Sequence, residues 1–212
     1  MDLDLQDIRF ITFEGIDGCG KTTQLDLLAS WLIDKHVDVF KTAQPGGTEL
    51  GTKIRRILLK HHGDISPTAE LLLFAADRAQ HIDTVIRYAV KRGTLVLCDR
   101  YIHSTIAYQG YGRGLNLNLI EQLNFFATGG LEPDLTFWID TPVEVAMSRC
   151  RYPDQIERLG TDFQEKVRTG FSDLWVQHFD RIVRIDGNQS AEEIHEEIRS
   201  GFAMAANQDS NS

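Results

Sequence analysis

One eight-residue motif near the N-terminus limits what this chain can fold into. It fits the pattern G-x-x-x-x-G-K-[ST] and reads Gly15-Ile16-Asp17-Gly18-Cys19-Gly20-Lys21-Thr22. An apolar run at residues 8–13 precedes it, and residues 20–35 follow with apolar residues at helical spacing. In that setting the N–H groups of the loop and the start of the helix form a cradle for phosphate. The motif predicts a nucleoside triphosphate site, and the alternative is a glycine-rich turn that binds nothing.

Two side chains of the motif have separate expected roles. The ammonium group of Lys21 can reach the β- and γ-phosphate oxygens, and the Thr22 hydroxyl can bind Mg²⁺. The motif does not say how the triphosphate is used. A switch of the G-protein type would need a guanine-reading N-K-x-D segment, which the sequence lacks.

Apolar runs alternate with helical patterns along the rest of the chain. Strands are expected at 8–13, 37–43, 95–98, 135–139 and 182–185, and helices at 20–35, 51–60, 67–92 and after Thr141 and Ser190. Ser66 and Pro67 suit the cap and first position of the longest helix. This alternation predicts an α/β fold with a five-stranded, mainly parallel sheet flanked by helices. Ligands then bind at the carboxyl ends of the strands.

Length, net charge and cysteine spacing indicate which partners and which cellular location to expect. The 212 residues suit a single domain spanning 1–212, and a net charge of −9 disfavours nucleic acid and anionic membranes as partners. No segment reads as a signal peptide or a membrane span. The three cysteines show no disulfide or zinc spacing, which favours a cytoplasmic location. The polar tail at about 207–212 is expected to fray.

Further segments, in the same order along the chain, resemble one family, the thymidylate (dTMP) kinases. They are Phe13-Glu14 before the loop and Thr23-Gln24 after it, Gln44-Pro45-Gly46-Gly47-Thr48, Glu70-Leu71-Leu72-Leu73-Phe74-Ala75-Ala76-Asp77-Arg78, Asp99-Arg100-Tyr101, Ser104, and Ala107-Tyr108-Gln109-Gly110. The resemblance covers residues 8–200. It implies a P-loop nucleoside monophosphate kinase fold with a short lid, ATP and Mg²⁺ as co-substrates, dTMP as phosphoryl acceptor, and a homodimer.

Asp99 and Arg100 follow the most apolar expected strand. A lone buried aspartate there would be costly without a cation, so Asp99 is expected near Mg²⁺ or the attacking phosphate. Arg100 can hold the acceptor phosphate through its planar guanidinium group. The alternative is that Asp99 and Arg100 simply pair with each other.

Phe74 and Arg78 are four residues apart and share one helix face. The spacing alone favours a core phenylalanine beside a solvated arginine. The resemblance instead implies that the ring stacks on thymine and that the guanidinium group donates to a base carbonyl.

The resemblance also assigns the remaining site residues. It implies that Arg55 binds the acceptor phosphate, that Tyr108 and Gln109 contact sugar and base, and that Asp17 approaches the sugar 3′-hydroxyl. ATP is expected on the whole loop from Gly15 to Thr22, with Thr23 and Arg149. The catalytic set is Lys21, Asp99, Arg100 and Arg151, and the metal ligands are Thr22 and Asp99.

A lid is expected at about 149–160, where Arg149, Arg151 and Arg158 concentrate positive charge on an acidic chain. A solvated helix–loop–helix surface is the alternative. Gln155 stands where the family usually has arginine. Arg151 is our expected catalytic arginine, with Arg149 stacked on adenine and Arg158 as the alternative catalytic residue.

A second departure from the family lies at Ala43-Gln44, where Arg-Glu is common. The change deletes either a salt bridge or a carboxylate near the metal. The leading hypothesis remains transfer of a phosphoryl group from ATP to dTMP. The alternatives are a kinase for another nucleoside monophosphate and a non-enzymatic ATP-dependent switch.

Overall fold

The five expected strands form one sheet. The computed structural model describes residues 8–60, 63–150 and 159–208. Within them the sheet has the order β2-β3-β1-β4-β5, and all four pairings are parallel. The strands are β1 (Phe10–Glu14), β2 (Val39–Ala43), β3 (Leu95–Asp99), β4 (Leu135–Asp140) and β5 (Ile182–Asp186). The expected α/β fold is confirmed, with boundaries shifted by one or two residues.

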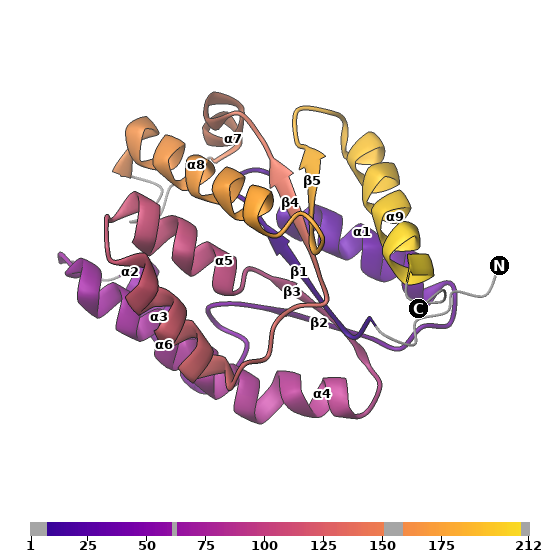
Figure 1. Ribbon diagram of the computed structural model, residues 1–212, viewed down its shortest axis with the longest axis horizontal. Coiled ribbons are helices and arrows are strands. Elements are labelled where there is room, and N and C mark those ends of the chain that lie inside the picture. Colours follow the sequence, from indigo (N-terminus) through magenta and orange to yellow (C-terminus); the bar gives the residue numbers. More distant parts are fainter. Residues whose placement is uncertain (1–7, 61–62, 151–158, 209–212) are drawn as a thin grey trace.

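Helices cover both faces of the sheet (Figure 1). The helices are α1 (Lys21–Ile33), α2 (Glu49–Lys60), α3 (Pro67–His81), η1 (Ile82–Ile86), α4 (Arg87–Lys91), α5 (Ile102–Thr105), η2 (Ile106–Gly112), α6 (Leu117–Thr128), α7 (Val143–Arg149), α8 (Thr161–Gln177) and α9 (Ala191–Gln208). α1 and α9 lie side by side on one face, and α8 lies on the other with the helices that follow β2 and β3 (Figure 1). Right-handed crossovers between parallel strands produce this distribution, since β1→β2 runs opposite to the later connections.

The long helix expected at 67–92 is present as a continuous run of α3, η1 and α4. The Ser66 side chain accepts a hydrogen bond from the Ala69 N–H at 3.3 Å, and Pro67 is the first helical residue. The run ends before Gly93, which has a φ of 82°. At the other end of the chain, α9 includes two residues of the expected tail, and residues 209–212 lie outside the described part.

The central strands are buried because helices lie on both sides of them. Every residue of β1 and β4 is buried, and the Phe13 and Phe137 rings lie 5.6 Å apart between these strands. Among the described residues, no helix is both long enough and apolar enough to cross a membrane.

The carboxyl ends of three neighbouring strands bring distant segments together. Phe13 on β1 and Ala43 on β2 both pair in register with Asp99 at the end of β3. The glycine-rich loop, the segment after β2 and the Asp99-Arg100 pair therefore share one edge of the sheet. This is the edge at which ligands bind in parallel sheets.

A buried hydroxyl pair joins β1 to β4 and gives a test of the register. Thr12 Oγ1 and Thr136 Oγ1 lie 2.8 Å apart, and both residues are buried. Thr12→Val leaves the Thr136 hydroxyl unpaired and should lower the free energy of unfolding by about 1–3 kcal/mol. Adding Thr136→Val should recover most of that loss in urea denaturation. A double variant that loses as much as the two single variants summed would contradict the pairing.

Candidate active site

The glycine-rich loop has backbone angles that favour glycine. Gly15, Gly18 and Gly20 have φ values of 138°, 80° and 102°. A Cβ atom on Gly18 would lie 2.2 Å from the Ala146 carbonyl oxygen, so α7 closes one side of the loop. Gly20 caps α1 without a side-chain hydrogen bond. The first N–H groups of this 13-residue helix are therefore left for a bound anion.

Lys21 lies against the loop and is only 6% exposed. Its Nζ donates to the carbonyl oxygens of Gly15 at 3.1 Å and Ile16 at 2.9 Å. These contacts hold a positive charge beside the loop N–H groups, where phosphate oxygens would need it.

The two expected metal ligands meet. The Thr22 hydroxyl donates to Asp99 Oδ2 at 2.7 Å, across the gap between α1 and β3. A hydroxyl and one carboxylate are hard oxygen donors, and Mg²⁺ bound with nucleotides uses few protein ligands besides phosphate and water. The residues at this position therefore fit a Mg²⁺ ion.

Arg100 links the loop to the segment after β3. Its backbone adopts a φ of 69°, rare for a residue with a side chain. The guanidinium group donates to Asp17 at 2.5 Å, Ser104 Oγ at 2.9 Å, the Gly15 carbonyl at 3.0 Å and Tyr108 Oη at 3.1 Å. The alternative of a pair with Asp99 is wrong, because the carboxylate that pairs with Arg100 among the described residues is Asp17.

Asp17 is held ionised by its neighbours. Burial would raise its pKa, but the charges of Arg100 and Lys21 outweigh burial and lower the pKa from 3.8 to about 2. Its second oxygen accepts from the Tyr108 hydroxyl at 2.9 Å. A charged carboxylate of the phosphate loop therefore pairs with Arg100.

Glu14 supports Arg100 from inside the fold. One carboxylate oxygen accepts from the backbone N–H groups of Tyr101 at 2.8 Å and Ser104 at 3.2 Å. The other lies 2.5 Å from Ser104 Oγ, which itself accepts from Arg100. Burial raises the pKa of Glu14, although Ser104 and Arg100 act against this.

Arg78 is buried, so the alternative of a solvated arginine is wrong. It is 2% exposed and donates to four acceptors: Gln44 Oε1 at 3.0 Å, Thr105 Oγ1 at 2.8 Å, Asn124 Oδ1 at 2.6 Å and the Tyr101 carbonyl at 2.9 Å. A guanidinium group has five N–H donors. Most of its donors therefore fix its own position, and few remain for a ligand.

Gln44, at the second expected departure from the family pattern, contacts Arg78. Because its carbonyl accepts from Arg78, its amide donates to His81 Nδ1 at 3.2 Å, and His81 Nε2 donates to Thr42 Oγ1 at 2.8 Å. Burial and the charge of Arg78 lower the pKa of His81 to about 4, so the ring is neutral. In this chain Arg78 is thus satisfied at Nε by an uncharged amide oxygen.

Two hollows adjoin at this edge of the sheet. An outer cleft of about 1250 Å³ is lined by the loop from Asp17 onward, including Thr23, and by Asp99 and Arg149. A narrow inner pocket of about 70 Å³ lies beside it. All seven residues expected at the acceptor line the inner pocket, namely Asp17, Arg55, Phe74, Arg78, Arg100, Tyr108 and Gln109. Arg55 and Arg100 line both hollows.

The structure also places three other residues expected at the ATP site. Gly15 and Ile16 face Lys21 and do not line the outer cleft. Arg149 ends α7 and lies 3.5 Å from the Gly18 carbonyl. Arg151 and Arg158 lie outside the described residues.

Sequence reasoning missed several residues that hold the site together. Glu14 and Ser104 were visible only as parts of family segments, without a role, and Gln44 only as a departure from the family pattern. Asp77 accepts from the Gly46 N–H at 3.0 Å and fixes the segment after β2. No local pattern distinguishes Asn124, which reaches Arg78 from 46 residues away along the chain.

The Asp17–Arg100 pair predicts a pH dependence of stability. A lowered pKa in the folded state stabilises the fold above about pH 4, and this contribution disappears as the pH falls toward 2. Asp17→Asn should therefore lower the free energy of unfolding by about 2 kcal/mol at pH 7 and by roughly half that at pH 3. Urea denaturation across this range measures it, with Asp83→Asn on an exposed site as control. A loss of unfolding free energy that is equal at both pH values would contradict the Asp17–Arg100 pairing.

Comparisons with known proteins agree on one family. The model of the thymidylate kinase family matches residues 13–198. A thymidylate kinase of a Nostoc species is 49% identical over 197 residues, covering 90% of this chain and 93% of that relative. That of Gloeobacter violaceus is 48% identical over 204 residues, covering 94% and 96%. The crystal structure of thymidylate kinase from Ehrlichia chaffeensis superposes with a TM-score of 0.78 at 37% identity, covering 91% of this chain and 97% of that one. The chain therefore belongs to the thymidylate kinase family and has its P-loop nucleoside monophosphate kinase fold.

Proposed function

We propose that this protein transfers the γ-phosphoryl group of ATP to dTMP, giving dTDP and ADP. One observation carries the proposal beyond family membership. Two cationic groups, Arg55 and Arg100, stand at the border between the phosphate-loop cleft and the inner pocket. A protein that only senses ATP has no need for this second anion site.

The outer cleft is the donor site in this proposal. Lys21 neutralises the phosphates of ATP, and Arg149 stacks on the adenine. Thr22 and Asp99 would hold Mg²⁺, which when bound offsets the phosphate charge and orients the γ-phosphoryl group. Asp17 and Arg100 keep each other in place beside the path between donor and acceptor.

The inner pocket is the acceptor site. Arg55 and Arg100 bind the dTMP phosphate, and Phe74, Arg78 and Gln109 hold the thymine. Arg55 donates to the Pro45 carbonyl at 2.8 Å, which aims it from α2 toward this pocket. Asp17 contacts the 3′-hydroxyl, and Tyr108 leaves no room for a ribose 2′-hydroxyl. Catalysis then consists of aligning two anions, offsetting their repulsion and excluding water.

We further propose a cytoplasmic homodimer. Exposed apolar side chains lie on α3 and α6, which pack on each other: Leu72 is 54% exposed, Leu119 56% and Phe126 84%. Unpartnered apolar side chains on adjoining helices suit the contact between two copies.

The direct test is a panel of acceptors. With MgATP, we expect diphosphate formation from dTMP to exceed that from dUMP, UMP, CMP and AMP. Lys21→Ala should abolish transfer while the protein stays folded, and Lys91→Ala, on the distant α4, should behave as wild type. A Lys21→Ala variant that keeps more than about a tenth of kcat would contradict the phosphate-loop assignment. A preference for another acceptor would support the alternative kinase, and ATP hydrolysis unaffected by any acceptor would support a switch.

The lid arginines give a second test. Gly18 provides no basic side chain in the loop, so the cation between donor and acceptor must come from elsewhere. We expect Arg151→Ala to lower kcat by on the order of 10³-fold or more, with little change in either KM. Arg158→Ala is the matched control. A loss below tenfold for Arg151→Ala, with a far larger loss for Arg158→Ala, would assign the role to Arg158.

A further inference from the structure

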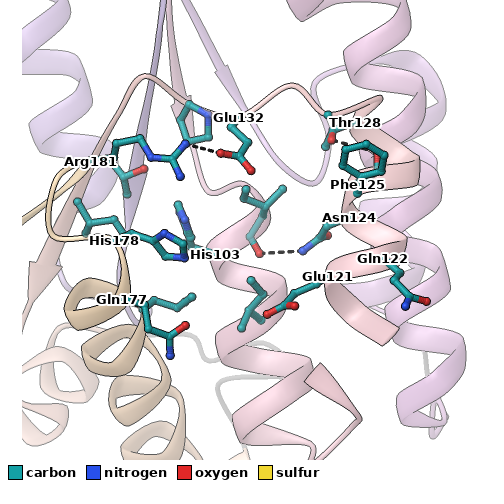
Figure 2. A pocket seen from close by; sticks show the side chains of 17 residues that line it. His103, Glu121, Gln122, Asn124, Phe125, Thr128, Glu132, Gln177, His178 and Arg181 are labelled. Atoms are coloured by element: carbon teal, nitrogen blue, oxygen red, sulfur yellow. Dashed lines mark hydrogen bonds and ion pairs between the residues drawn. The ribbon is translucent and has the colours of Figure 1, made fainter. Parts of the chain in front are cut away.

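A second cavity lies away from the site described above. It measures about 580 Å³ and is enclosed by α5, α6 and the end of α8, below the first residues of β4 and β5 (Figure 2). None of its lining residues lines the outer cleft or the inner pocket. We refer to it as the α5–α6–α8 pocket. Its size falls in the range of small-molecule sites.

A buried imidazole in this pocket lacks a hydrogen-bond partner. His103 is 8% exposed, and its Nδ1 has none among the described residues. Its ring faces that of His178, with the centroids 6.3 Å apart (Figure 2). Burial, with the nearby charges of His178 and Arg181, lowers the pKa of His103 to about 3. The ring is therefore neutral, and in the tautomer protonated at Nε2 its Nδ1 is an acceptor that a ligand N–H can satisfy.

The charges around the α5–α6–α8 pocket disfavour the binding of an anion. Arg181, the one arginine lining it, already pairs with Glu132 (Figure 2). Glu121 also lines it and forms no ion pair among the described residues. Both α6 and α8 end here, and the carboxyl end of a helix carries partial negative charge. The pocket therefore favours hydrogen-bond donors over phosphate.

The lining favours a planar ring. Phe125, 70% exposed, offers an aromatic face at the rim, and the amide of Gln177 can bond hydroxyl groups. A ligand that meets all these conditions is flat, uncharged, bears an amino group and has hydroxyl groups toward the rim. An amino-bearing nucleoside without phosphate has this chemistry.

The inner wall of the α5–α6–α8 pocket adjoins residues that contact the two arginines of the acceptor site. α5 has four residues: Ile102 and His103 line the pocket, while Ser104 and Thr105 accept from Arg100 at 2.9 Å and Arg78 at 2.8 Å. Asn124, another lining residue, accepts from Arg78 at 2.6 Å and donates to the Ile102 carbonyl at 3.3 Å. A ligand in the pocket would thus contact Asn124, which holds Arg78, and the two α5 residues that directly precede Ser104 and Thr105.

We propose that the α5–α6–α8 pocket is a regulatory site for an amino-bearing nucleoside, whose binding strengthens the binding of dTMP. Packing a ligand against α5 and Asn124 restricts the motion of the groups that hold Arg78 and Arg100, which lowers the entropic cost of dTMP binding. The regulatory effect rests on the proposed function of the acceptor site, whereas binding to the pocket does not.

Binding is tested by calorimetry on protein saturated with MgADP and dTMP, so that neither nucleotide site is open. The probes are cytidine against uridine, and adenosine against inosine, which differ in one amino group, together with CMP and spermidine. We expect cytidine or adenosine to bind at least fivefold more tightly than its partner and than CMP. Binding of neither amino nucleoside, or tighter binding of CMP or spermidine, would overturn the proposal.

Location and coupling are tested with two tryptophan variants on α8. Gln177→Trp places an indole at the pocket rim, while its neighbour Val176, 64% exposed, does not line the pocket. Gln177→Trp should weaken nucleoside binding at least tenfold and Val176→Trp should not. With wild type, the bound nucleoside should lower the KM for dTMP at least threefold and leave the KM for ATP unchanged. An unchanged or raised KM for dTMP, or equal effects of both variants, would overturn the proposal. Turnover of dTMP without nucleoside, measured first, reports separately on the proposed function.

Discussion

The site depends on Arg100, a partly buried positive charge at the carboxyl end of β3. Its side chain joins three segments that are far apart in sequence: the phosphate loop through Gly15 and Asp17, α5 through Ser104, and η2 through Tyr108. A guanidinium group largely removed from water needs its donors satisfied, so its partial burial by itself calls for these contacts. The positive φ of Arg100 is an unfavourable backbone conformation, and the surrounding contacts hold the residue in it.

Arg78 combines a structural role with its proposed role in recognition. Its four protein acceptors come from different segments, and they leave a guanidinium group fixed at the wall of the inner pocket. Removing one partner of a buried charge costs more than the hydrogen bond itself, because the charge is then left unsatisfied. The amide of Gln44 satisfies Arg78 without adding a negative charge to a pocket proposed to bind a phosphate. A preorganised pocket loses less entropy when the ligand binds.

The strand pattern was predictable because it depends on local properties. Apolar runs bounded by turn residues placed all five strands, since a parallel sheet buried on both faces needs such runs. The motif at residues 15–22 placed the phosphate loop, and Ser66-Pro67 placed the start of α3. The long helix was also predicted, but its π-helical part η1 was not, because no local residue type marks such a change.

The sequence by itself determined the sheet and the loop, because these follow from short-range patterns, and its resemblance to a family indicated which residues line the inner pocket. Only the tertiary structure decided which charges pair. Arg100 could have paired with adjacent Asp99 and instead pairs with Asp17, which is 83 residues away, because the backbone at the end of β3 turns its side chain toward the loop. The burial of Arg78 and the cavity beside α5 likewise depend on α6 and α8, which fold back from later in the chain. Ion pairs and cavities are set by distances between segments, and a linear sequence does not contain those distances.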